Sequence, residues 1–138
     1  MSYRLRIPCS KGNLKLIREF VNSTLEELCV PEAEINMMIL AVDEVCANRI
    51  IHSNHNDERR QLELKIEDVQ EGLSFEIKDK GEPFDLAAYQ EPSLPQLIAE
   101  KRKGGIGLIL VKRIMDSVEV FTENQYTIYR LFKKVKAC

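Results

Sequence analysis

Two segments that alternate apolar and polar residues, joined by only three residues, set the strongest constraint on the fold. The segments are QLELKIEDV at 61–69 and LSFEIKD at 73–79, and QEG lies between them. A period of two places the apolar side chains on one face of a strand, and so short a connection joins antiparallel neighbours. The pair therefore predicts a β-hairpin with one buried face.

Segments with the strand period and segments with the helix period alternate along the rest of the chain. The order strand, helix, helix, two strands, helix, two strands predicts an α+β fold. We expect a two-layer sandwich with helices on one face of a mostly antiparallel mixed sheet. The predicted strands are 3–7, 61–69, 73–79, 117–122 and 127–135, and the predicted helices are 14–28, 31–53 and 106–116.

Length and charge restrict the domain count and the partners. A chain of 138 residues suits one domain, 1–138, that buries its own core. The net charge of −2 and the pI near 5.8 give no general attraction to nucleic acid or to an acidic membrane, so any anion binding must be local. No run reaches transmembrane length and no apolar signal segment is visible, so we expect a cytoplasmic protein.

The four cysteines are scattered along the chain and form no C-x-x-C pair. They are Cys9, Cys29, Cys46 and Cys138. This spacing argues against a zinc site or a disulfide framework, and it is compatible with a reducing cytosol.

An otherwise apolar helical segment, LAVDEVCANRIIHSN at 40–54, carries Glu44, Asn48 and His52 four residues apart. At about 100° per residue these side chains form one line along the helix. A half-buried polar group costs roughly 1–3 kcal/mol unless a partner satisfies it. The partner is either nearby backbone or a ligand. An Asn oxygen suits Mg²⁺, and a carboxylate one turn earlier can orient or deprotonate a hydroxyl or water.

His52, at the end of this line, has three possible roles. It can support the residues that touch a ligand, belong to the core, or cap the end of the helix. We favour a structural role over direct ligand contact.

The segment KDKGEPFD at 78–85 places Asp79 at the end of a predicted strand and Gly81 two residues later. A carboxylate there can accept a hydrogen bond from an exocyclic amine such as that of adenine, and a glycine lets a flat ring approach closely. The alternative is a plain turn, because D-x-G is common in turns.

The segment KRKGGIGLILVKR at 101–113 places three glycines before a helix and three cations upstream of them. Backbone N–H groups at a helix start can bind phosphate. The segment is neither a Walker motif nor a complete dinucleotide fingerprint, which would need a third spaced glycine. The alternative is a flexible loop with a solvated charge run.

Taken in order, these motifs resemble those of the GHKL (Bergerat-fold, histidine-kinase-like) ATPases. The phrases EVCANRIIHSN, DKGEPFD and GGIGLILVKRIMDSVEV are similar to the small serine-kinase anti-sigma factors of bacterial partner-switching systems. The residues that carry the resemblance are Glu44 and Asn48 in the N box, Asp79 and Gly81 in the G1 box, and Gly105, Gly107 and Leu108 in the G2 box.

The resemblance implies a Bergerat-type ATP-binding fold and a role for each matching residue. Glu44 would act as the catalytic base and Asn48 as the Mg²⁺ ligand. Asp79 would hold the adenine amino group, and Gly81 would make room for the ring.

Further along the chain, the resemblance implies a phosphate-binding segment beneath a movable lid at about 86–104. Arg102 would reach the terminal phosphate, an assignment that rests on charge and location alone. The residues that would bind the nucleotide in this segment are Gly104, Gly105, Ile106, Gly107 and Leu108.

The implied function is that of an ATP- and Mg²⁺-dependent protein serine/threonine kinase and anti-sigma regulatory factor. It would transfer the γ-phosphate to a Ser or Thr of an antagonist protein, bind a sigma factor or similar regulator, and form a homodimer. The alternative is a nucleotide-dependent regulator-binding module without significant kinase activity. Glu44 favours the kinase, because such a module has no evident need for a base there.

One residue departs from the family pattern. Arg49 follows Asn48 where the family usually has a small residue. On the helical wheel it lies about 140° from Glu44, so we expect its side chain to reach an edge of the domain and leave the site open.

Overall fold

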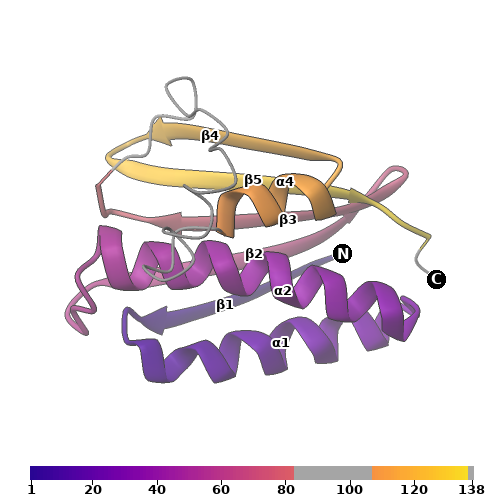
Figure 1. Cartoon of the computed structure of the whole chain (residues 1–138), viewed down its shortest axis with the longest axis horizontal. Coiled ribbons are helices and arrows are strands. Elements are labelled where there is room, and N and C mark those ends of the chain that lie inside the picture. Colours follow the sequence, from indigo (N-terminus) through magenta and orange to yellow (C-terminus); the bar gives the residue numbers. More distant parts are fainter. Residues whose placement is uncertain (83–106, 137–138) are drawn as a thin grey trace, which may run out of the picture.

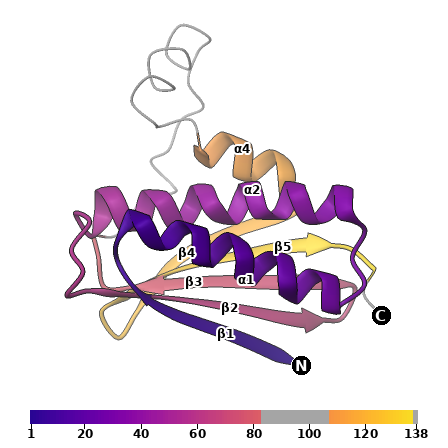
Figure 2. The ribbon, with the colours of Figure 1, turned by 90° about the horizontal axis from the view of Figure 1, so that it is seen from below.

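The computed structural model describes residues 1–82 and 107–136. Within them, helices cover one face of a five-stranded sheet and leave the other face open (Figures 1 and 2). The strands are β1 (Ser2–Pro8), β2 (Gln61–Val69), β3 (Gly72–Asp79), β4 (Ser117–Glu123) and β5 (Tyr126–Lys134). The helices are α1 (Leu14–Glu27), α2 (Glu32–Asn48) and α4 (Gly107–Ile114), with a short 3-10 helix, η1 (Lys11–Asn13), and a π-helical turn, η2 (Arg49–Ser53).

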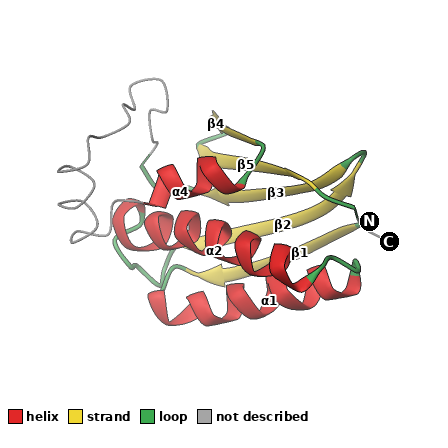
Figure 3. Ribbon diagram, turned by 45° about the vertical axis from the view of Figure 1, so that its right-hand side comes forward, coloured by secondary structure: helices red, strands yellow, loops and turns green. Residues whose placement is uncertain are grey.

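The order of the strands in the sheet is β1-β2-β3-β5-β4, and all four pairings are antiparallel (Figure 3). Two of these pairings, β2 with β3 and β4 with β5, are hairpins between consecutive strands. The pairing of β3 with β5 joins segments distant in sequence and sets Asp79 opposite Thr127. The end of β3 therefore lies inside the sheet, flanked by a strand on each side.

The period-two pattern of the hairpin produces the predicted buried face. In β2 and β3 every second residue is buried beneath the helices, and the residues between them face away from the helices. The buried side chains of the hairpin are Leu62, Leu64, Ile66, Leu73, Phe75, Ile77 and Asp79. Asp79 is thus the one carboxylate among the buried side chains of the hairpin.

The second helix differs from its predicted extent. The α-helix ends at Asn48, and the chain continues as the π-turn η2 from Arg49 to Ser53. Pro31, with which the predicted helix 31–53 begins, lies at the N-cap. In a π-helical turn the backbone hydrogen bonds join residues five apart instead of four apart, and such turns often lie at functional sites.

The predicted α+β two-layer architecture is confirmed, and the predicted strands match the observed ones closely. One expectation about the cysteines is wrong: Cys29 is disulfide-bonded, whereas Cys9 and Cys46 are free and buried. Among the described residues no helix has the length and apolar character needed to cross a membrane. The predicted lid at about 86–104 lies outside the described residues.

Candidate functional site

Three elements that carry the predicted motifs lie next to one another. Helix α2 packs against β3 and alongside α4, as Figures 1 and 2 show. Arg49, the residue after Asn48, bonds directly to Asp79 at the end of β3. The structure therefore brings the N-box and G1-box residues to one end of the molecule, and α4 begins with the last two G2-box residues, Gly107 and Leu108.

Glu44 and Asn48 lie one turn apart on α2, and both are half-buried. In the described part of the chain neither side chain forms a hydrogen bond or an ion pair. Burial raises the pKa of Glu44 above its ordinary value, and the neighbouring Asp43 carboxylate raises it further. The result is a carboxylate that favours taking up a proton, beside an amide oxygen that is open to a cation.

These two residues fit the chemistry of a magnesium nucleotide. The described residues contain no group of three or more His, Cys, Asp or Glu that would hold a metal by protein ligands alone. Mg²⁺ in nucleotide sites usually takes one or two protein ligands and fills its remaining positions with phosphate oxygens and water. An Asn48 oxygen without a protein partner suits that arrangement.

His52 does not belong to the core. It lies in the π-turn η2 and is exposed, so the core role considered for it is wrong. Of the three polar side chains spaced four residues apart, Glu44 and Asn48 are half-buried and His52 is exposed.

Arg49 contradicts its prediction most clearly. Its side chain is buried, with 1% of its surface exposed, instead of reaching an edge of the domain. Nε and Nη2 donate to the two oxygens of Asp79, each at 2.8 Å, and Nη1 donates to Ser53 Oγ at 2.8 Å. The helical wheel predicts the direction of the Arg49 side chain around the helix axis. It holds no information about β3, which lies in that direction and supplies the buried carboxylate of Asp79.

The Asp79 carboxylate is completely buried and accepts four hydrogen bonds. Three of them end on Oδ1: from Arg49 Nη2, from Asn54 Nδ2 at 2.9 Å and from the Gly81 N–H at 2.7 Å. The fourth runs from Arg49 Nε to Oδ2. Both oxygens that were predicted to receive an adenine amino group are therefore already bonded to protein.

Gly81 has a structural reason to lack a side chain. A Cβ atom there would lie 2.7 Å from Ser53 O and 2.8 Å from both Asn54 Nδ2 and Asp79 Oδ1. The space beside Gly81 is thus filled by the turn that follows α2.

Asn54 was not singled out from the sequence, where it lies in a polar stretch interpreted as a loop. It is fully buried; Nδ2 donates to Arg49 O and Asp79 Oδ1, and Oδ1 has no partner among the described residues. The signal for this cluster was an Arg within an apolar helix, because such a residue needs a buried carboxylate. Asp79 ends a predicted strand face whose other residues, Leu73, Phe75 and Ile77, are apolar.

Part of the predicted phosphate-binding segment falls outside the described residues. The predicted nucleotide-binding residues that fall outside are Arg102, Gly104, Gly105 and Ile106. Gly107 is the first residue of α4, and Leu108 is half-buried.

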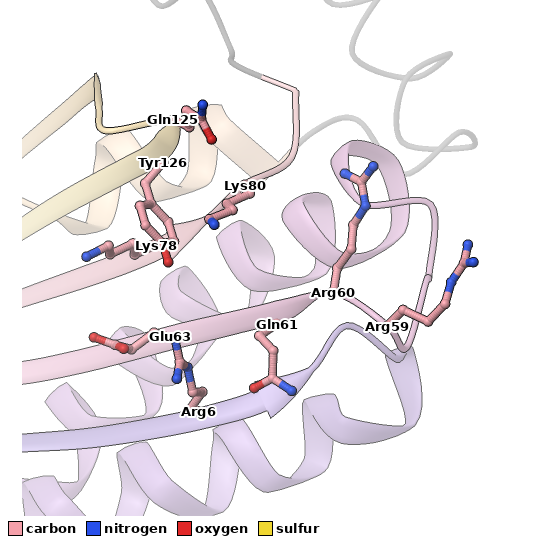
Figure 4. Close-up of a pocket in the computed structure, with 9 residues that line it drawn as sticks. All are labelled: Arg6, Arg59, Arg60, Gln61, Glu63, Lys78, Lys80, Gln125 and Tyr126. Atoms are coloured by element: carbon pink, nitrogen blue, oxygen red, sulfur yellow. The ribbon is translucent and has the colours of Figure 1, made fainter.

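A separate concavity of about 560 Å³ lies on the open face of the sheet (Figure 4). Lys78 and Lys80 alternate with Asp79, so their side chains emerge on the opposite face, and both ammonium groups lie over the Tyr126 ring at 4.4 and 5.0 Å. This basic groove contains none of the predicted nucleotide-site residues. Its lining is Arg6, Arg59, Arg60, Gln61, Glu63, Lys78, Lys80, Gln125 and Tyr126.

Comparison with a protein family covers nearly the whole chain. A model described as the histidine kinase-like ATPase domain matches residues 7–133. That range contains the described elements of the site and also the segment 83–106, which lies outside the described residues.

Curated relatives are similar over most of their length. The chain is 30% identical over 129 residues to the serine-protein kinase RsbW of Staphylococcus epidermidis, covering 90% of this chain and 81% of that protein. It is 23% identical over 128 residues to the serine-protein kinase RsbW of Bacillus subtilis, covering 90% of this chain and 80% of that protein.

Solved structures share the fold. The RsbU and RsbW domains of Rv1364c from Mycobacterium tuberculosis match 98% of this chain and 32% of theirs, with a TM-score of 0.71 and 11% identity. The SiaB–SiaC complex from Pseudomonas aeruginosa includes a chain that matches 95% of this one and is itself 88% covered, with a TM-score of 0.61 and 13% identity.

Proposed function

The chain belongs to the histidine kinase-like ATPase family, in the branch of the RsbW serine-protein kinases, and we propose that it is an ATP-dependent protein serine/threonine kinase acting as an anti-sigma factor. The observation that carries this proposal is the pair formed by Glu44 and Asn48. Both are half-buried, one turn apart, and not engaged by other described residues.

Glu44 supports a kinase because its environment suits a general base. A base that accepts a proton from a serine hydroxyl works best when its pKa is raised toward the working pH. Burial and the Asp43 charge both act on Glu44 in that direction. A module that only bound nucleotide would not need a carboxylate in this state.

The proposed reaction is transfer of the γ-phosphoryl group to a serine or threonine of an antagonist protein. Glu44 accepts the hydroxyl proton as the hydroxyl oxygen forms a bond to the γ-phosphorus. The bond between that phosphorus and the β,γ-bridging oxygen breaks, and ADP leaves with the electron pair. Most of the catalysis in such transfers comes from positioning and charge neutralisation.

Mg²⁺ is the proposed metal, and Asn48 is its proposed protein ligand. When bound, the ion neutralises the phosphate charge that develops during transfer. Asn48 follows Glu44 by one turn of α2, on the same face of the helix, so base and metal would lie on one side of the nucleotide. Gly107 and Leu108, at the start of α4, are proposed to contact the phosphates.

The proposed partners follow from the family. We propose a sigma factor or similar regulator as the sequestered protein, an antagonist protein as phosphoacceptor, a homodimer as the assembly, and the cytoplasm as the location. Capture of the regulator and phosphorylation of the antagonist would use the same nucleotide-bound domain.

A phosphotransfer assay tests this proposal. The purified chain is incubated with Mg²⁺ and ATP labelled at the γ-phosphate, together with candidate antagonist proteins of the same organism. We expect label on one antagonist, and phosphoamino acid analysis should place it on serine or threonine.

Glu44→Gln is the informative variant in this assay. It keeps the size and polarity of the side chain but cannot accept the proton, so we expect unchanged nucleotide affinity and a loss of transfer of about 100-fold or more. Binding of ATP without transfer to any antagonist by the wild type would favour the nucleotide-dependent binding module instead. Full transfer by the variant would remove Glu44 from the role of base.

A further inference from the structure

We propose that the basic groove on the open face of the sheet is a docking site for an acidic segment of a partner protein. Figure 4 shows the side chains of the groove on the side of the sheet turned away from α2, the helix that carries Glu44 and Asn48. No step of the proposed phosphotransfer uses this groove. The inference therefore goes beyond the proposed function and does not depend on it.

The first support is the excess of positive charge in the groove. Its lining contains three arginines and two lysines but only one carboxylate, that of Glu63. Arg59 forms an ion pair with Asp57 at 2.9 Å. The other four cations form no ion pair within the part of the chain that the structure describes: Arg6, Arg60, Lys78 and Lys80. An anionic ligand would therefore meet cations there that no described carboxylate neutralises.

The second support is the contrast with the charges next to the groove on the same face. Glu76 on β3 forms ion pairs with Lys65 Nζ at 3.3 Å and Arg130 Nε at 3.8 Å. These two cations lie opposite Glu76 on the neighbouring strands β2 and β5. Lys78, two residues further along β3, lies between Glu63 and Ile128, and it has no such pair among the described residues. The unpaired positive charge is thus confined to the groove.

The third support is the distribution of these cations over several strands. Arg6 on β1 lies opposite Glu63 on β2, which in turn lies opposite Lys78 on β3. Arg6 and Lys78 are therefore two strands apart, a separation of about 10 Å between their backbones. A ligand that reaches both needs several negative charges spaced along its length. An extended peptide provides this, because alternate side chains on one of its faces lie about 7 Å apart.

The polar residues among the cations favour a peptide over a nucleic acid. Gln61, Glu63 and Gln125 contribute side-chain acceptors to the lining, and a peptide backbone has N–H donors for them, whereas a sugar-phosphate backbone has none. The Glu63 carboxylate would also repel phosphates. The ring of Tyr126, the aromatic group of the groove, already has the ammonium groups of Lys78 and Lys80 over it at 4.4 and 5.0 Å, where a base would stack.

The charge of the groove also argues against a second copy of this chain as its occupant. In a symmetric dimer formed groove against groove, each cation would face the cations of the other copy. Like charges set against each other across an interface cost several kcal/mol. An acidic segment has the complementary charge and avoids this repulsion.

Fluorescence anisotropy with a labelled peptide tests this inference. The probe is a peptide of about ten residues that alternates Glu and Ser, long enough to cross the groove, and its control has Gln in place of every Glu. We expect the wild-type chain to bind the Glu peptide at least about tenfold more tightly than the Gln peptide at low salt. Added salt should weaken the binding, because it screens exposed charges. Equal binding of the two peptides, or binding of neither, would overturn the inference.

The double substitution Lys78→Glu with Lys80→Glu locates the binding. We expect it to weaken binding of the Glu peptide by about tenfold or more. Lys15→Glu with Arg113→Glu is the matched control, because it changes the net charge equally on α1 and α4, on the other side of the sheet. Its affinity should stay within about twofold of the wild type. An equal loss in this control would reduce the binding to general charge attraction and overturn the inference.

A milder variant keeps the test decisive if the charge reversal does not fold. Lys78→Gln with Lys80→Gln removes both charges without adding a carboxylate beside Glu63. We expect it to bind the Glu peptide about threefold or more weakly than the wild type. Unchanged affinity in this folded variant would contradict the inference.

Two further measurements test the other occupants of the groove. Tighter binding of a single-stranded DNA with as many charges as the Glu peptide would assign the groove to nucleic acid and overturn the inference. Analytical ultracentrifugation tests the second copy, and we expect the Lys78→Glu with Lys80→Glu variant to sediment as the wild type does. A wild-type dimer that this variant dissociates would make the groove an interface between copies and contradict the inference.

Discussion

Glu44 is the residue whose environment bears most directly on chemistry. It is half-buried, and its pKa is raised first by burial and second by the carboxylate of Asp43. A base is active when deprotonated, so a raised pKa moves the loss of activity on acidification to a higher pH. The phosphotransfer rate should therefore begin to fall at a pH above that expected for an ordinary glutamate.

Asp43→Asn tests this link. The change removes a negative charge beside Glu44, which lowers the pKa of Glu44 toward its ordinary value. We expect the acid limb of the pH–rate profile for phosphotransfer to move to lower pH. Asp68→Asn, at the far end of β2 where Asp68 pairs with the N-terminus, should leave the profile unchanged. An acid limb that stays in place in Asp43→Asn would assign the titration to another group.

At the scale of residues, the candidate site residues could be predicted from the sequence, whereas most of the side chains around them could not. Glu44 and Asn48 were found because four-residue spacing places them on one helix face. The buried partner of Arg49 was missed because a helical wheel holds no information about the strand packed against the helix. Asn54 was missed because burial of a polar loop residue depends on tertiary contacts.

The π-turn η2 is the element that joins the helix layer to the end of β3. Arg49 starts this turn, and its bonds to Asp79 connect it to the strand. Breaking a buried ion pair by removing one partner leaves an uncompensated charge, which typically costs about 3–5 kcal/mol. Asp79→Asn is therefore expected to lower the free energy of unfolding by about that amount, measured by urea denaturation.

A surface ion pair provides the control for this prediction. Arg18 and Asp43 pair at 3.0 Å between α1 and α2, with side chains 46% and 24% exposed. Asp43→Asn should change the free energy of unfolding by only about 0–1 kcal/mol. If Asp79→Asn costs no more than Asp43→Asn, the Arg49–Asp79 pair does not hold the turn to the strand. A large cost would also mean that lost ATP binding in Asp79→Asn cannot be assigned to base recognition.

Gly81 tests the packing of the same turn. In Gly81→Ala the new Cβ would lie within 2.8 Å of Ser53 O, a backbone atom, so the turn must shift. We expect a loss of about 1–3 kcal/mol in the free energy of unfolding. Gly12→Ala, whose Cβ would meet only Ser10 Oγ at 3.7 Å, should stay within about 0.5 kcal/mol of the wild type. Equal effects of the two substitutions would show that the turn adapts.

At the scale of elements, the strands were predicted closely because alternation is a local property of the sequence. The end of α2 was not predicted correctly. Over a single turn, the spacing of apolar residues fits an α-helix and a short π-helical turn equally well. The boundary matters, since Asn48 ends the α-helix and Arg49 begins the turn.

At the scale of the whole molecule, the layers followed from the sequence but the strand order did not. Hairpins are set by short connections, so β2–β3 and β4–β5 were predictable. The pairing of β3 with β5 depends on packing between segments far apart in the chain. This pairing places Tyr129 opposite Ile77, in the sheet beneath Arg49.

The two faces of the sheet offer anions two different places to bind. The helix-covered side carries the candidate nucleotide site, and the open side carries the basic groove around Lys78, Lys80 and Tyr126 (Figure 4). A chain with a net charge of −2 does not attract anions as a whole, so binding at either place has to be local. Locating the bound nucleotide therefore distinguishes between them.

Amide chemical-shift mapping by NMR, during titration with Mg²⁺ and a non-hydrolysable ATP analogue, tests the central claim most directly. We predict that the largest shifts cluster at Glu44 to Asn48, Gly81 and Leu108, where α2, the end of β3 and the start of α4 meet. Shifts confined to Arg60, Lys78 and Tyr126, with the amides of α2 and α4 unmoved, would place the nucleotide on the open face and contradict the proposed site.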